Sequence, residues 1–98
     1  MASKLFDSPA MRETLRRTVR AQMAYRGMDY QDLSRALVGL GVEQAAGNLR
    51  TKVNTGALGA QLFVYILLAL DAKTLDLGHT RDLLEDVRTE LDAREQGE

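Results

Sequence analysis

Residues 29–56 read DYQDLSRALVGLGVEQAAGNLRTKVNTG, and this stretch decides the fold. Apolar side chains recur every three or four residues in both halves, which predicts helices over Tyr30–Leu40 and Glu43–Asn54. Gly39 and Gly41 lie between the two halves and permit a sharp, left-handed turn. A helix, a glycine-containing turn and a second helix form the order of a helix-turn-helix unit.

Helices are also predicted on both sides of this stretch. Ser8 before Pro9 is a strong helix start and Gly27 is a good stop, so the first helix is expected over Pro9–Arg26. The run Ala60–Leu70 is apolar on almost every side, as a helix buried on most sides would be. A central strand is the competing interpretation, but no other segment could pair with it as a sheet.

The last predicted helix covers Thr80–Arg94, with Thr80 as its N-cap and an acidic outer side. The predicted fold class is therefore all-α, a compact bundle of about five helices with a helix-turn-helix unit. Residues 1–98 are expected to form a single domain, with the helix-turn-helix core over 9–75 and an amphipathic acidic helix over 79–95. The expected centre of the core is Leu62, Phe63, Ile66 and Leu70.

Composition argues against catalysis and against a membrane segment. Cysteine is absent and His79 is the only histidine, so thiolate sites and multi-histidine metal sites are excluded. No glycine-rich phosphate loop follows a strand, and no serine has a nearby base. The longest apolar run is too short to cross a bilayer, and the N-terminus has no signal-peptide pattern. We expect a cytoplasmic protein that is not an enzyme and holds neither metal nor cofactor.

The charge of the chain is divided between its two ends. Residues 1–56 carry nine lysines and arginines against five aspartates and glutamates, whereas residues 57–98 carry four against nine. A basic front half and an acidic back half indicate separate electrostatic roles, although chance clustering on solvated helix faces would give the same pattern.

The third predicted helix carries side chains suited to DNA on one side. With Leu49 placed inward, Gln44, Asn48 and Thr51 point outward together, and Gln, Asn and Thr suit base edges in the major groove. Gly47 would let the helix approach closely. The flanking residues expected on phosphates are Arg50, Lys52 and Thr55. Polar residues on an exposed helix are also what any soluble helix shows.

The first helix adds a basic ridge. Arg12, Arg16 and Arg20 follow one another at steps of four, with Arg17 beside them. We expect a ridge that faces phosphates or a partner, with Arg16, Arg17 and Arg20 as the phosphate contacts. A solvated face is the alternative.

These features resemble phage-repressor-like (Cro/C1-type) domains, in which the second helix of the unit enters the major groove. The connection Val38–Val42 is longer than their usual tight turn. Residues 20–75 also resemble a small family of uncharacterised bacterial proteins. The matching residues are Tyr30, Leu33, Leu37, Gly41, Val42, Asn48, Leu49, Lys52, Val53 and Gly56.

The resemblance to phage-repressor-like domains implies a DNA-binding helix-turn-helix protein, bacterial or from a phage, that acts in transcription regulation. Its partner would be double-stranded DNA. The alternative is a helical adaptor or an antitoxin-like protein that binds another protein and not DNA, because a fold does not guarantee a function.

The last helix has an apolar stripe that must be buried somewhere. Leu77, Leu84, Val87 and Leu91 form it. The stripe can pack on its own domain or on a second copy, and the seven-residue spacing of the leucines suits a helix pair. The sequence thus predicts a homodimer interface here, with cis packing or another protein partner as the alternatives.

Overall fold

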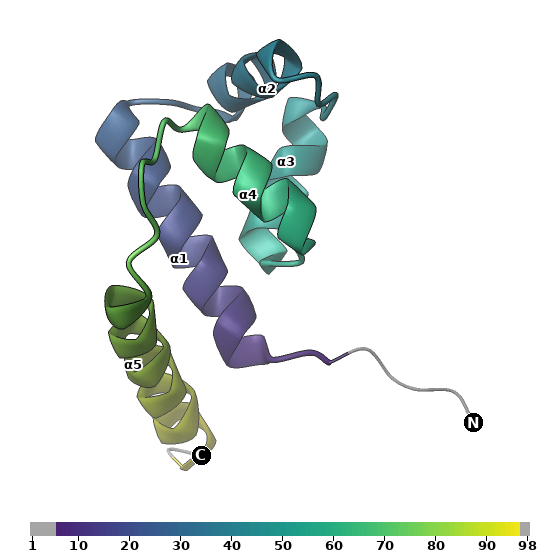
Figure 1. Cartoon of the computed structure of the whole chain (residues 1–98). Coiled ribbons are helices and arrows are strands. Elements are labelled where there is room, and N and C mark those ends of the chain that lie inside the picture. Colours follow the sequence, from purple (N-terminus) through teal and green to yellow (C-terminus); the bar gives the residue numbers. More distant parts are fainter. Residues whose placement is uncertain (1–5, 97–98) are drawn as a thin grey trace, which may run out of the picture.

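Five helices make up the computed structural model, which describes residues 6–96; this part of the chain contains no strand. The helices are α1 (Pro9–Arg26), α2 (Tyr30–Gly39), α3 (Ala46–Thr55), α4 (Ala60–Ala69) and α5 (Leu77–Gln96). α1 packs on α3 and α5, and α2 packs on α3 and α4. Figure 1 shows α2, α3 and α4 grouped on one side of α1, with α5 beside α1 and away from that group. The predicted all-α class is confirmed.

α1 begins and ends where the sequence predicts. The hydroxyl of Ser8 accepts a hydrogen bond from the Met11 amide at 3.1 Å, and Pro9 occupies the first turn. Gly27 ends the helix in the left-handed conformation, with φ at 65°. These are the start and stop chemistries that ordinary helices use, so this helix could be placed from local sequence alone.

α2 starts with a reciprocal cap. The Asp29 carboxylate accepts from the Asp32 amide at 2.8 Å, and the Asp32 carboxylate accepts from the Asp29 amide at 3.0 Å. Hydrogen bonding to the Asp32 backbone holds the pKa of Asp29 below its ordinary value. The helix ends at Gly39, and Gly41, with φ at 83°, turns the chain toward α3.

Two predicted helix starts are wrong. α3 begins at Ala46, three residues after Glu43, and its N-cap Ala45 provides no side-chain hydrogen bond. α5 begins at Leu77, ahead of the predicted Thr80. The Asp76 carboxylate accepts from the His79 amide at 3.1 Å, which is the geometry of an N-cap. Asp76 therefore caps α5.

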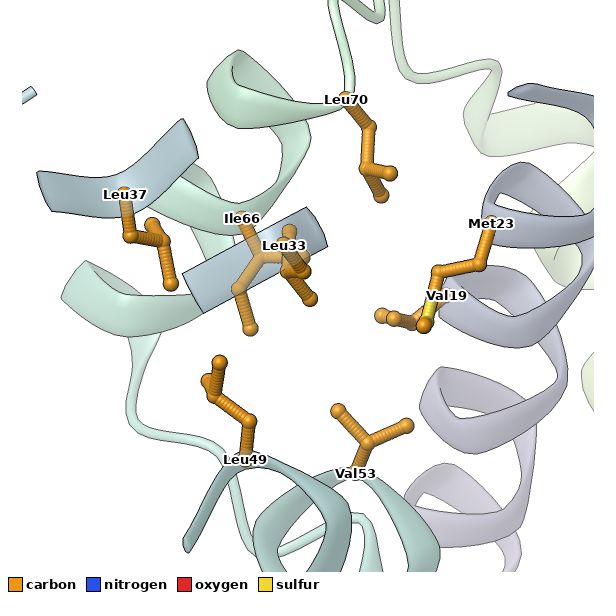
Figure 2. Close-up of a cluster of buried hydrophobic side chains, with 8 residues drawn as sticks. All are labelled: Val19, Met23, Leu33, Leu37, Leu49, Val53, Ile66 and Leu70. Atoms are coloured by element: carbon orange, nitrogen blue, oxygen red, sulfur yellow. The ribbon is translucent and has the colours of Figure 1, made fainter. Parts of the chain in front are cut away.

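The core lies between α1, α2, α3 and α4. Its eight buried side chains converge in Figure 2: Val19, Met23, Leu33, Leu37, Leu49, Val53, Ile66 and Leu70. Ile66 and Leu70 take the central place expected of them. Leu62 and Phe63 are only partly buried and pack against this cluster, so the expectation that they form its centre is wrong.

α5 is attached to the domain through α1. Val87 is 1% exposed, and Leu84 and Leu91 are half-buried, because α5 packs along α1. Leu77 is 67% exposed at the start of the helix. The stripe is thus largely buried in cis, and the prediction that Val87 belongs to a dimer interface is wrong, since its own chain already covers it.

One glycine fixes how closely the α3–α4 junction approaches α1. Gly56 ends α3 with φ at 66°, and it is buried against the backbone of Arg12. A Cβ at this position would lie 2.1 Å from the Arg12 carbonyl oxygen. Only glycine satisfies both the left-handed backbone and this approach.

No single helix within residues 6–96 is long and apolar enough to span a membrane. α3 and α4 taken together meet the length and composition criteria, but a bend of 115° separates them.

Candidate nucleic-acid interface

α3 buries one side and exposes the other. Leu49 and Val53 are fully buried in the core, while Asn48, Arg50 and Thr51 are exposed. The Asn48 side chain forms no hydrogen bond to another part of residues 6–96, so its amide is available to a ligand. We call Gly47, Asn48, Arg50 and Thr51 the α3 face. The predicted base-reading residues Asn48 and Thr51 lie together on it.

Gln44 does not belong to this face. Because α3 begins at Ala46, Gln44 lies in the connection from α2 and is half-buried there. Its backbone oxygen accepts from the Ser34 hydroxyl at 2.6 Å, and its side-chain oxygen accepts from Lys52 Nζ at 3.2 Å. The expectation that Gln44 reads bases from a helix is therefore wrong. Its observed role is to tie the connection to α2 and α3.

A cluster of four side chains joins α1, α2 and α3 beside the α3 face. The Arg50 guanidinium lies 5.4 Å from the centroid of the Tyr30 ring, a cation–π distance. The Tyr30 hydroxyl and Arg20 Nη1 both donate to Asn54 Oδ1, each at 3.4 Å. Two exposed guanidinium groups, from α1 and α3, are thereby held around one tyrosine and one asparagine.

Sequence reasoning missed Tyr30 and Asn54 as parts of this cluster. Neither residue is among the DNA contacts that the sequence predicts. The available signal was the spacing of Asn54 four residues after Arg50, which places the two on neighbouring turns of one side. That Arg20 reaches them from another helix depends on packing and has no local signature.

The threonines of α3 use their hydroxyls within the helix. Thr51 Oγ1 donates to the Gly47 carbonyl at 3.2 Å, which leaves its methyl group available for an apolar contact. Thr55 Oγ1 donates to the Thr51 carbonyl at 2.9 Å and accepts from the Ala57 amide at 3.3 Å. Thr55 thus closes the C-terminal end of the helix, where the helix dipole disfavours an anion.

The predicted basic ridge of α1 is divided by ion pairs. Arg12 pairs with Asp7, and Arg16 pairs with Glu13. Arg17 pairs with Glu13 at 2.7 Å and, from α5, with Glu90 at 2.6 Å. The hydrogen bonds that Arg17 donates to these carboxylates raise the pKa of Arg17, with the bond to Glu90 contributing most, and Arg17 in turn lowers the pKa of Glu90.

Two of the three arginines predicted to contact phosphates, Arg16 and Arg17, are therefore already engaged by carboxylates. By contrast, neither Arg20 nor Arg50 forms an ion pair within residues 6–96. α3 also carries no acidic residue, although exposed Glu43 lies three residues before it. Arg20 and Arg50 therefore place two unpaired positive charges beside the α3 face, although Arg26 and the three arginines of α5 are also without an ion pair in this part of the chain. Among the described residues, no group of three or more histidines and acids could hold a metal ion.

Residues 11–75 match the family described as "Domain of unknown function (DUF6471)". The chain belongs to this family. The DUF6471 region begins inside α1 and ends before α5, so it contains all eight residues of the core cluster, the α3 face and α4. No curated protein and no solved structure matches the chain. The resemblance to phage-repressor-like domains accordingly stays a prediction.

Proposed function

We propose that this DUF6471 protein binds double-stranded DNA through the α3 face, as a helix-turn-helix protein that acts in transcription control. The observation that carries the proposal is an exposed, acid-free helix side with a guanidinium from α1 and one from α3 beside it, neither in an ion pair within residues 6–96. Concentrated positive charge beside hydrogen-bonding side chains is what phosphate attachment and base reading require.

In this proposal α3 enters the major groove. The Asn48 amide pairs with an adenine edge, and the Thr51 methyl contacts a thymine methyl. Gly47 carries no side chain and allows a close approach. The amides at the start of α3 receive no side-chain cap in the described chain, so they are open to a phosphate, which helix N-termini favour.

Phosphate contacts are assigned to Arg50 and Arg20, which the cluster around Tyr30 holds in place. Lys52 is half-buried and donates to Gln44, so it approaches a phosphate only as part of that pair. Arg16, Arg17 and Thr55 are left out of the proposed interface, because ion pairs or helix-end hydrogen bonds already engage them.

The test starts with selection of bound fragments from random genomic DNA, followed by fluorescence anisotropy titrations on a selected site. Asn48→Ala is expected to cost about 1–3 kcal/mol of binding and to relax specificity at one position. Arg50→Ala is expected to weaken binding to all sequences alike and to reduce the salt dependence of binding by about one phosphate. The matched control is Arg88→Ala, an exposed arginine of α5, which should bind like the parent.

The proposal fails if Asn48→Ala and Arg50→Ala both bind the selected site as the parent does. It also fails if selection recovers no DNA while a protein is retained from lysate. That second result would favour the adaptor or antitoxin-like alternative.

A further inference from the structure

α4 has two apolar sides, and only one of them faces the core. Ile66 is fully buried and Leu70 is 1% exposed. On the other side Val64 is 53% exposed, Tyr65 is 40% exposed and Leu68 is 55% exposed. We call Gln61, Val64, Tyr65 and Leu68 the outer α4 face. Their spacing of three and four residues makes one continuous strip along the helix.

Nothing in the described chain covers this strip. α4 packs chiefly on α2, and α5 lies on α1 instead. Figure 1 shows α4 on the near side of the molecule with α5 well away from it. The strip lines a shallow hollow together with Ala60, and Leu75, which is 41% exposed, follows in the next connection. Single exposed apolar residues are ordinary, but a continuous strip of them marks a contact surface.

We propose that the outer α4 face is the contact surface for a second copy of this chain, so that the protein forms a two-fold symmetric dimer through α4. The dimer does not depend on DNA binding. The contact helix of this dimer is α4, whereas the sequence predicts the dimer interface on α5.

The absence of charge favours a second copy as the occupant. Residues 57–70 contain no Lys, Arg, Asp or Glu. In a two-fold contact the same face meets itself, so a face that carries a net charge meets the same net charge on its copy. The outer α4 face meets this condition, and its tyrosine is a residue type enriched in interface cores, where charged residues are depleted.

α5 fails the same condition. Its exposed side chains include six acids against three arginines: Asp82, Glu85, Asp86, Glu90, Asp92 and Glu95 against Arg81, Arg88 and Arg94. Two such helices placed against each other would repel at neutral pH, and the apolar Val87 is already used in cis. The uncharged helix is therefore the one that can pair with its copy.

The size of the contact sets its strength. A helix of ten residues is about 15 Å long, and a stable interface buries about 800 Å² on each partner. A pair of α4 helices alone falls at the small end of this range. We therefore expect a reversible dimer with a dissociation constant on the order of micromolar, and not a permanent one.

Sedimentation of the full chain from low to high micromolar concentration tests the proposal. The parent chain should shift from monomer to dimer across this range. Leu68→Lys should raise the dissociation constant at least about tenfold, because it places a charge against its own copy. Leu77→Lys on α5 is the matched control. Leu77 is 67% exposed, and its substitution should leave the dissociation constant unchanged. Far-UV circular dichroism and melting curves check that each variant folds.

A milder variant serves if Leu68→Lys unfolds. The chain has no cysteine, so a single introduced thiol reports its own surroundings. Leu68→Cys should form a disulfide-linked dimer under mild oxidation much faster than Leu77→Cys. A parent chain that stays monomeric at high micromolar concentration overturns the proposal, as does a dimer that Leu68→Lys leaves intact or equal cross-linking at both positions. A monomer that instead captures a different protein on α4 overturns it too.

Discussion

α3 and α4 are neighbouring helices of ten residues that bury the same kind of strip and expose opposite kinds. Leu49 and Val53 of α3 meet Ile66 of α4 in one core cluster. On the outside, α3 presents Asn48 and Thr51 beside positive charge, whereas α4 presents apolar side chains without any charge. Folding needs only the inner strips, since burial of apolar area drives it.

The outer strips are not explained by stability. An exposed Leu68 side chain does not stabilise the fold, and an exposed Arg50 side chain stabilises it little beyond its contact with Tyr30. The contrast is what the two proposals require, in which α3 binds a polyanion and α4 binds a second copy of the chain. The substitutions with the largest expected effects lie in the inner strips and at Gly56, the residue that joins the two helices.

The largest expected effect comes from Gly56→Ala, at the junction of α3 and α4. The new Cβ would overlap the Arg12 carbonyl oxygen at 2.1 Å, and alanine would also have to hold φ at 66°. Together the two penalties should cost about 4 kcal/mol or more of the free energy of unfolding. Urea denaturation measures it. Gly47→Ala is the matched control: its Cβ meets nothing within 4 Å, so it should stabilise α3 by about 0.5–1 kcal/mol. Equal effects at both glycines would contradict this reasoning.

The next effect contrasts the inner and outer strips directly. Leu49→Ala and Ile66→Ala should each cost about 2–5 kcal/mol, because both side chains are fully buried. Leu68→Ala should change the free energy of unfolding by no more than about 0.5 kcal/mol at concentrations where the chain is monomeric. Denaturation of the three variants side by side measures this. A loss at Leu68 comparable to that at Ile66 would mean that the outer α4 face is part of the monomer core.

These residues also mark how far the sequence could predict the fold. α1 was placed to the residue because Ser8, Pro9 and Gly27 act locally. The sequence predicts a start of α3 that is too early, because Ala45 provides no side-chain cap to mark it and the apolar spacing extends backward to Val42. The sequence predicts a start of α5 that is too late, because Thr80 is a suitable N-cap residue although Asp76 supplies the cap.

The surfaces were harder to predict than the helices. Periodicity showed that α4 is apolar all round, but not that only one side has a neighbour, because that depends on where α5 packs. The pairing of Arg17 with Glu90 joins residues 73 apart in sequence. In the proposed interface, Asn48 and Thr51 could be placed from helical spacing alone. The contact between Tyr30 and Arg50 could not be predicted from spacing, nor could the position of Gln44 outside the helix.

The smallest expected effect tests whether α1 widens the positive surface beside α3. Arg17 lowers the pKa of the Glu90 carboxyl from its ordinary value of 4.5, chiefly by hydrogen bonding. A lowered folded-state pKa means that the ionised carboxylate stabilises the fold. This stabilisation is fully present above the unfolded-state pKa and is lost as pH falls through the folded-state value. Glu90→Gln should therefore be slightly less stable than the parent at neutral pH, and their denaturation curves should converge in acid.

The control for this prediction is Glu85→Gln, which makes the same charge change at an exposed residue of α5. Glu85 forms no ion pair within residues 6–96. DNA affinity of Glu90→Gln should stay within about twofold of the parent, since exposed ion pairs contribute little and Arg17 points toward α5, whereas Arg20 points toward α3. A marked gain in affinity specific to Glu90→Gln would show that release of Arg17 adds a phosphate contact. The positive surface would then run from α3 onto α1, and the acidic α5 would compete with DNA for it.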